Sequence, residues 1–141
     1  MNRYVFVPTE YQNPFPRVSQ IVDAEEMPTT YPDGVMGQWI DVTGNNTVQV
    51  GWKADYVGGW VFSELTHQDY LNLAVRNTNQ LFSAASSWLV FNPLQYKLDL
   101  GVATPADEAA LLAYKQYYVA ISDVKNQSGY PQTINWPVAP F

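Results

Sequence analysis

The chain has 141 residues, 47 % of them hydrophobic, so it can bury a core and is not disordered throughout. Its seven Lys and Arg residues are scattered and its net charge is −6, which excludes the basic patch that nucleic acids and anionic membranes attract. It has no apolar run of the roughly 20 residues that span a membrane, and no Cys for a disulfide or thiolate site. We therefore expect no nucleic-acid or membrane partner, and action in a cytoplasm.

Residues 1 to about 65 have the pattern of β structure. The Tyr-Val-Phe-Val sequence at residues 4–7 predicts a short strand that Pro8 ends. Residues 8–32 then contain five prolines, and proline disfavours helices and withholds a hydrogen-bond donor from a sheet. We expect this segment to be a surface loop with one short strand at Val18 to Val22.

Three further runs have strand character and are separated by Gly and Asn residues that suit turns: Trp39–Val42, Thr47–Trp52 and Trp60–Phe62. In the second run, Val48, Val50 and Trp52 fall on one face. Successive runs with short turns pair most simply with each other. The pattern therefore predicts a β meander or a pair of hairpins.

The period of the apolar residues changes at Thr66, where Thr66 and Asp69 form an N-cap signature. After it, residues suited to one face of a helix recur at spacings of three and four: Leu71, Val75, Thr78, Phe82, Ala85 and Leu89. Pro93 predicts that this helix ends near residue 91. A short helix is expected at residues 94–100, and Gly101 closes it.

The start of the last helix is clearly marked. Thr104 is a good N-cap, Pro105 suits the first helical position, and Asp107 and Glu108 place negative charge in the first turn. The apolar face of this helix carries Ala110, Tyr114, Tyr117, Ile121 and Val124. Ser128-Gly129 is expected to end the helix.

The chain closes with a proline-rich tail from Tyr130 onward, which must be extended or turned. We expect Ile134 and Trp136 to pin this tail against the helices. The fold class predicted from the whole pattern is α+β, with a β-rich module at residues 1–65 and a helical module at residues 66–141.

No group of residues has the spacing of an active site. His67 is the one histidine, and it lacks a partner at His-x-Glu or His-x-x-x-His spacing. Asp107 and Glu108 are adjacent on a helix, so they point about 100° apart, and their first-turn position already explains them. We expect a protein that is not an enzyme and that holds no metal or cofactor.

Three segments near the C-terminus occur in a characteristic order: Leu100-Gly-Val-Ala-Thr104, Leu111-Leu-Ala-Tyr-Lys-Gln-Tyr117 and Ile134-Asn-Trp-Pro-Val-Ala-Pro140. Their order and spacing resemble the tail-fibre assembly (chaperone) proteins of tailed bacteriophages. The resemblance is good over residues 78–140 and loose over the first 65. One departure is Tyr118, where the family pattern usually has an arginine.

The resemblance implies a non-enzymatic chaperone that acts in the host cytoplasm during virion assembly. Such a protein binds the C-terminal, receptor-binding end of a tail fibre and promotes its folding and trimerisation. In some phages the protein stays on the mature fibre tip, where a glycan contact is a further expectation. The alternative that the residues leave open is a fibre-tip adhesin or carbohydrate-binding module of a phage tail.

Aromatic residues make up 15 % of the chain and charged residues only 14 %. A partner surface on such a chain is expected to use rings, because Tyr and Trp carry much of the energy of protein interfaces. We predict that partner contacts come from this set: Trp52, Tyr56, Trp60 and Tyr118. Tyr114 and Tyr117, on the apolar face of the last helix, are expected to be core.

Overall fold

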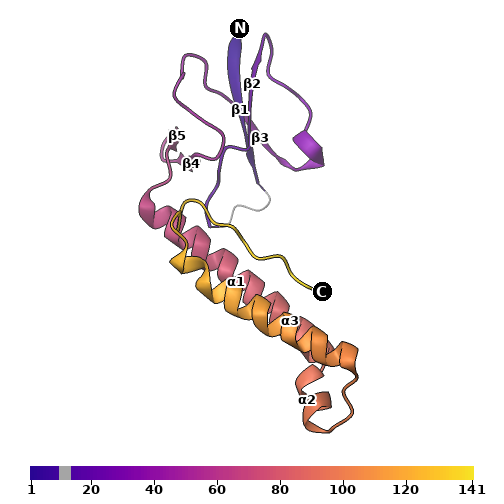
Figure 1. Cartoon of the computed structure of the whole chain (residues 1–141). Helices are drawn as coiled ribbons and strands as arrows, with labels where there is room; N and C mark the ends of the chain where they lie inside the picture. Colours follow the sequence, from indigo (N-terminus) through magenta and orange to yellow (C-terminus); the bar gives the residue numbers. More distant parts are fainter. Residues whose placement is uncertain (10–13) are drawn as a thin grey trace. The chain divides into compact units, whose positions relative to one another are not determined.

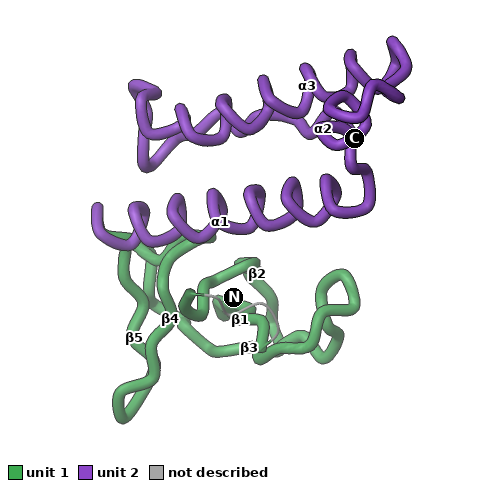
Figure 2. The backbone as a smooth tube through the Cα atoms, turned by 90° about the horizontal axis from the view of Figure 1, so that it is seen from below, with its two compact units in different colours: residues 1–66 green, residues 67–141 purple. Residues whose placement is uncertain are grey.

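The computed structural model describes residues 1–9 and 14–141 and has an α+β fold. Residues 10–13, which belong to the expected proline-rich loop, lie outside the described residues. The chain divides into two compact units, residues 1–66 and 67–141 (Figure 2). The strands lie in the first unit and the α-helices lie in the second (Figure 1).

A three-stranded antiparallel sheet with β1 at its centre organises the first unit. β1 (Asn2–Pro8) pairs with β2 (Gln20–Ala24) on one side and with β3 (Gly37–Asp41) on the other. A 3-10 turn, η1 (Pro32–Gly34), lies in the connection between β2 and β3. These three strands were all predicted, and the structure shifts their bounds only slightly along the chain.

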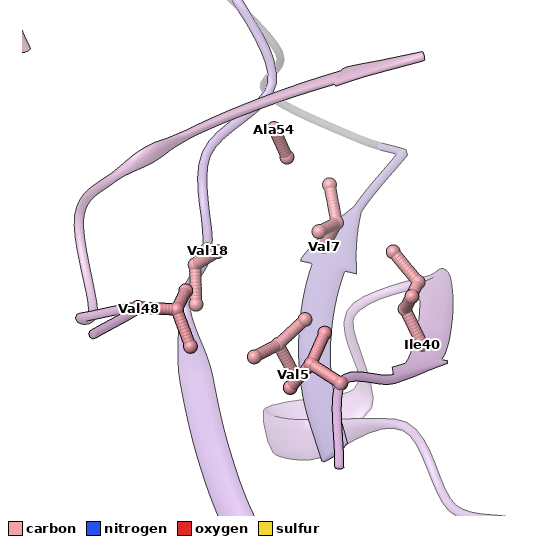
Figure 3. Close-up of a cluster of buried hydrophobic side chains, with 7 residues drawn as sticks. Val5, Val7, Val18, Ile40, Val48 and Ala54 are labelled. Atoms are coloured by element: carbon pink, nitrogen blue, oxygen red, sulfur yellow. The ribbon is translucent and has the colours of Figure 1, made fainter. Parts of the chain in front are cut away.

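β1 is buried on both faces, which makes it the centre of the unit. Val5 and Val7 enter a cluster of aliphatic side chains drawn from several segments: Val5, Val7, Val18, Ile40, Val42, Val48 and Ala54 (Figure 3). Tyr4 and Phe6, which alternate with the two valines, are buried as well, and the centroid of the Phe6 ring lies 5.1 Å from that of Trp39. A strand that is covered on both faces needs apolar residues at successive positions, and residues 4–7 of β1 are all apolar or aromatic.

The strand expected at Thr47–Trp52 is wrong. The side-chain oxygen of Asn45 accepts a hydrogen bond from the backbone N–H of Thr47 at 3.0 Å, which turns the chain at the start of that run. Gly51 then adopts a φ of +95°, a conformation that strands do not contain. Val48, Val50 and Trp52 therefore do not share one buried face, and Val50 is 60 % exposed.

The expected meander is also wrong, because β3 pairs with β1 and not with the next strand along the chain. β4 (Lys53–Tyr56) and β5 (Trp60–Ser63) instead form a separate antiparallel hairpin. Gly58 and Gly59 between them both have positive φ, as a tight turn of this kind requires. The hairpin alternative therefore holds for this pair of strands alone.

In the second unit, α1 (His67–Phe91) and α3 (Pro105–Ser122) lie side by side, and α2 (Leu94–Asp99) lies in the connection between them (Figures 1 and 2). α1 begins directly after Thr66 and ends before Pro93, as predicted. The seam is built from Ala85 and three α3 residues, with ring and leucine side chains around them: Tyr114, Tyr117, Ile121, Leu81, Phe82, Trp88 and Leu89.

The apolar face of α1 differs from the predicted one near its start. Val75 is 53 % exposed, and the adjacent Ala74 is buried in its place. Val75 lies three positions before Thr78 and Ala74 lies four, and both spacings place a residue on the same helix face as Thr78. The spacing alone could not choose between them. On α3, the predicted core positions Tyr114 and Tyr117 are confirmed as buried.

The start of α3 is confirmed in detail. The Thr104 hydroxyl accepts the N–H of Asp107 at 3.1 Å, and the Asp107 carboxylate accepts the N–H of Thr104 at 3.0 Å. The same carboxylate lies 3.7 Å from the ammonium of Lys97 in α2. The backbone hydrogen bond from Thr104, aided by the charge of Lys97, holds the pKa of Asp107 below its ordinary value. This one carboxylate therefore links the start of α3 to α2.

The end of α3 comes earlier than predicted. α3 stops at Ser122, and a 3-10 turn, η2 (Asp123–Asn126), replaces the expected last helical turns before Ser128-Gly129. The Gln127 side chain then makes two hydrogen bonds with the backbone of Asn135, at 2.9 and 2.8 Å. The polar side chain that fastens the tail is therefore one the sequence pattern did not single out.

The final residue also fastens the tail. The ring of Phe141 stacks on that of Trp88, with centroids 4.6 Å apart, and meets Tyr117 edge-on at 5.7 Å. Ile134 and Trp136, the anchors expected from the sequence, are half-buried. The end of the chain thus packs against the α1–α3 seam through a terminal aromatic ring.

Gly101→Val is expected to lower the free energy of unfolding by about 1 kcal/mol or more. Gly101 has a φ of +73°, and no atom lies within 4 Å of where a Cβ would sit, so the cost comes from the backbone conformation alone. Gly101→Asn should cost less, since Asn tolerates this region of φ. Denaturant unfolding followed by helical circular dichroism measures both, and equal midpoints for Val and Gly would contradict the helix end assigned here.

Asp107→Asn is expected to lower the melting temperature at pH 7 and to lower it by less near pH 3. The folded pKa of Asp107 is depressed, so its stabilisation is present above the ordinary carboxyl pKa of about 4 and is lost as the pH falls through the folded value. Glu108→Gln is the matched control, because that side chain is exposed and makes no hydrogen bond with the described residues. A difference from the parent that is equal at both pH values would refute the role of the charge.

Candidate partner-binding surface

Tyr56 and Trp60 are brought together by the β4–β5 hairpin. They face each other across the two strands, with ring centroids 5.4 Å apart and planes at 72°. Tyr56 is 69 % exposed, while Trp60 is half-buried and stacks on Phe62 at 6.3 Å. Edge-on packing holds the Tyr56 ring in place and leaves much of it accessible. The hairpin thus presents one ring supported by a second.

Trp52 does not join this pair. It precedes β4, is half-buried, and packs against the aliphatic cluster around Val5 and Val7. Its carbonyl accepts the N–H of Val18 at 2.9 Å, which holds its backbone against that segment. Trp60 packs against the same cluster, so the predicted β-module rings comprise one exposed ring, Tyr56, and two half-buried rings, Trp52 and Trp60.

Tyr118 lies on α3 and is 40 % exposed, in contrast to the buried Tyr114 and Tyr117. Its ring is 4.6 Å from that of Phe82 on α1 and 6.1 Å from that of Tyr114. Burial is the main cause that raises the pKa of the Tyr114 hydroxyl, which agrees with its core position. Tyr118 therefore forms the outer edge of the α1–α3 seam.

A further apolar surface, which the sequence reasoning missed, lies at the α2 end of the helical unit. Six large hydrophobic side chains are exposed there, and we call them the tip patch: Val90, Phe91, Tyr96, Leu98, Leu100 and Val102. Phe91, the last residue of α1, is 85 % exposed. An apolar cavity of about 340 Å³ adjoins the patch and shares Val90 and Tyr96 with it.

One feature of the sequence could have revealed the tip patch. Leu89, Val90 and Phe91 are consecutive at the end of a helix, and consecutive helical residues cannot all face one seam. Lys97 in this segment lies 3.7 Å from Asp107, and the exposed carboxylate of Asp99 accepts a hydrogen bond from Gln95 at 2.9 Å and keeps its negative charge. The tip patch is thus a set of apolar side chains with charged residues beside it.

The candidate chemical groups do not assemble into a site. His67 is exposed at the start of α1, and Asp107 is engaged in the cap of α3. Among the described residues, no three His, Asp or Glu side chains are close enough together to hold a metal ion. Within residues 1–9 and 14–141, none of the helices has the length and apolar character needed to cross a membrane.

Comparison with known proteins places these features in a family. No curated protein and no solved structure shows a significant match to the chain. A family model described as "Caudovirales tail fibre assembly protein, lambda gpK" matches residues 18–141. The matched range begins at Val18, after β1, and includes the β4–β5 hairpin, the tip patch, the capped start of α3 and Phe141. The chain therefore belongs to the Caudovirales tail fibre assembly protein family.

Proposed function

We propose that this protein is a non-enzymatic chaperone that binds the C-terminal end of a phage tail fibre and promotes its folding and trimerisation in the host cytoplasm. The observation that carries the proposal is the amount of apolar surface left open on a chain with so few charges. Contiguous exposed apolar patches on small proteins mark sites that another molecule covers. A tail fibre assembly protein has a tail fibre as its natural partner.

The physical demands of fibre folding fit such a surface. Strands that pair between three chains make non-local contacts, which form slowly and leave strand edges open to aggregation in the meantime. An exposed apolar surface can cover an apolar client segment. The tip patch offers such side chains, and the cation beside them, Lys97, is already paired with Asp107.

The proposed contact residues differ in how much of each aromatic ring is exposed to a partner. Tyr56 and Tyr118 are exposed, so they offer the most accessible contact area. Trp52 and Trp60 are half-buried and also support the fold of the β unit. We therefore assign Tyr56, Tyr118 and the tip patch as the principal fibre contacts, with Trp52 and Trp60 contributing their exposed edges.

The test is co-expression with the tail fibre of the same phage, with soluble trimeric fibre measured by size exclusion and light scattering. We expect trimer only when the chaperone is present. Phe91→Ser, Tyr56→Ala and Tyr118→Ala should each weaken fibre capture, and the strongest by about 2 kcal/mol, roughly thirtyfold. His67→Ala is the matched control, an exposed residue outside these surfaces that should leave assembly intact.

Circular dichroism of each variant separates loss of binding from loss of fold. Because Phe91, Tyr56 and Tyr118 are exposed, we expect the variants to melt within a few degrees of the parent. Trimeric fibre that forms equally well without the protein would overturn the proposed function. Normal fibre capture by all three folded variants would overturn the assigned surface.

A further inference from the structure

A cavity of about 470 Å³ is lined only by residues of the N-terminal unit and lies beside the backbone that joins Val18 to Gly51. The N–H of Val18 donates to the carbonyl of Trp52 at 2.9 Å, and the N–H of Gly51 donates to that of Val18 at 2.8 Å. Phe6 and Val18 line the cavity but are fully buried, so its accessible apolar surface comes from the half-buried Val35 and the exposed Val50. Apolar side chains thus form part of the cavity wall, and hydrogen bonds between backbone segments hold that wall in place.

The side chain of Arg17 lines the same cavity, and among the described residues a single hydrogen bond anchors it. Its Nε donates to the carbonyl of Gly51 at 2.9 Å, and its two terminal nitrogens make no hydrogen bond or ion pair with residues 1–9 or 14–141. Arg3 in the same unit is different, because it grips Asp23 with two nitrogens at 2.9 and 3.1 Å. A guanidinium held at Nε and open at its fork is suited to receive a carboxylate through two parallel hydrogen bonds.

Asp33 also lines the cavity, and no ion pair joins it to Arg17. Its φ is +53°, a left-handed conformation that non-glycine residues adopt rarely. The cavity therefore offers a cation, a separate acceptor and an apolar lining. A polypeptide matches all three, since it can bring a carboxylate, a main-chain N–H and an apolar side chain. An acidic sugar would set hydroxyl groups against Val35 and Val50.

We propose that this cavity binds a carboxylate of a polypeptide partner, with the carboxylate on the terminal nitrogens of Arg17 and a neighbouring apolar side chain against Val35 and Val50. The carboxylate can come from the C-terminus of the partner or from an Asp or Glu side chain. The inference does not rest on the proposed function, because a peptide tests it directly without a fibre.

The test is a nuclear magnetic resonance titration of the full chain with three synthetic peptides. The first is acetyl-Ala-Ala-Val-Leu with a free C-terminal carboxylate, and the second is the same peptide as a C-terminal amide. The third, acetyl-Ala-Glu-Val-Leu amide, carries only a side-chain carboxylate. We expect the amide signals of Val18 and Gly51 to shift saturably with the first or third peptide. The dissociation constant for the second should be about tenfold higher or more.

Variants of the arginines complete the test. Arg17→Gln should abolish the preference for the carboxylate peptides, Arg17→Lys should keep part of it, and Arg3→Gln should keep all of it. Well-dispersed spectra identify the variants that fold, and Arg17→Lys keeps the charge if Arg17→Gln does not fold. Binding that ignores the carboxylate, binding unchanged in both Arg17 variants, or no binding of any peptide would overturn the proposal. Equal shifts with glucuronate would assign the cavity to acidic sugars instead.

Discussion

The size of the two units is the constraint on which the rest of the structure depends. Residues 1–66 and 67–141 each form their own core, and a unit this small buries a lower fraction of its chain than a larger domain does. The first unit therefore concentrates its burial on β1, and the second on the α1–α3 seam. Hydrophobic side chains that neither core can enclose remain outside, at Tyr56, at Tyr118 and in the tip patch.

Local signals predicted the parts of the fold that depend on local chemistry. The capped start of α3, the break at Pro93 and the glycine after α2 each act through residues a few positions apart, so the sequence pattern placed them well. The pairing of β3 with β1 joins residues that are 29 to 37 positions apart, and no local pattern specifies it. The turn at Asn45 was expected, but Thr47–Trp52 alternates well enough to look like a strand, and the positive φ of Gly51 that breaks it was not foreseen.

In the candidate site, too, features set by local geometry were predictable and features set by distant contacts were not. The exposure of Tyr118 follows from its angle on α3 relative to Tyr114 and Tyr117, which helical geometry predicts. The packing of Trp52 and Trp60 against one core cluster, with Tyr56 left exposed, depends on which strand pairs with which, and the sequence could not show it. The role proposed for Arg17 could not be predicted from the sequence, because it depends on residues far along the chain, such as Gly51, that lie beside Arg17 in the fold.

The central claim is that the fibre covers the apolar surfaces that the two units leave open. Hydrogen–deuterium exchange of the protein, alone and bound to its tail fibre, tests this claim most directly. The account predicts slower exchange in the bound state at residues 90–102, with a second protected region at the β4–β5 hairpin or at Tyr118. Unchanged exchange at all of these positions, with protection elsewhere in the chain, would contradict it.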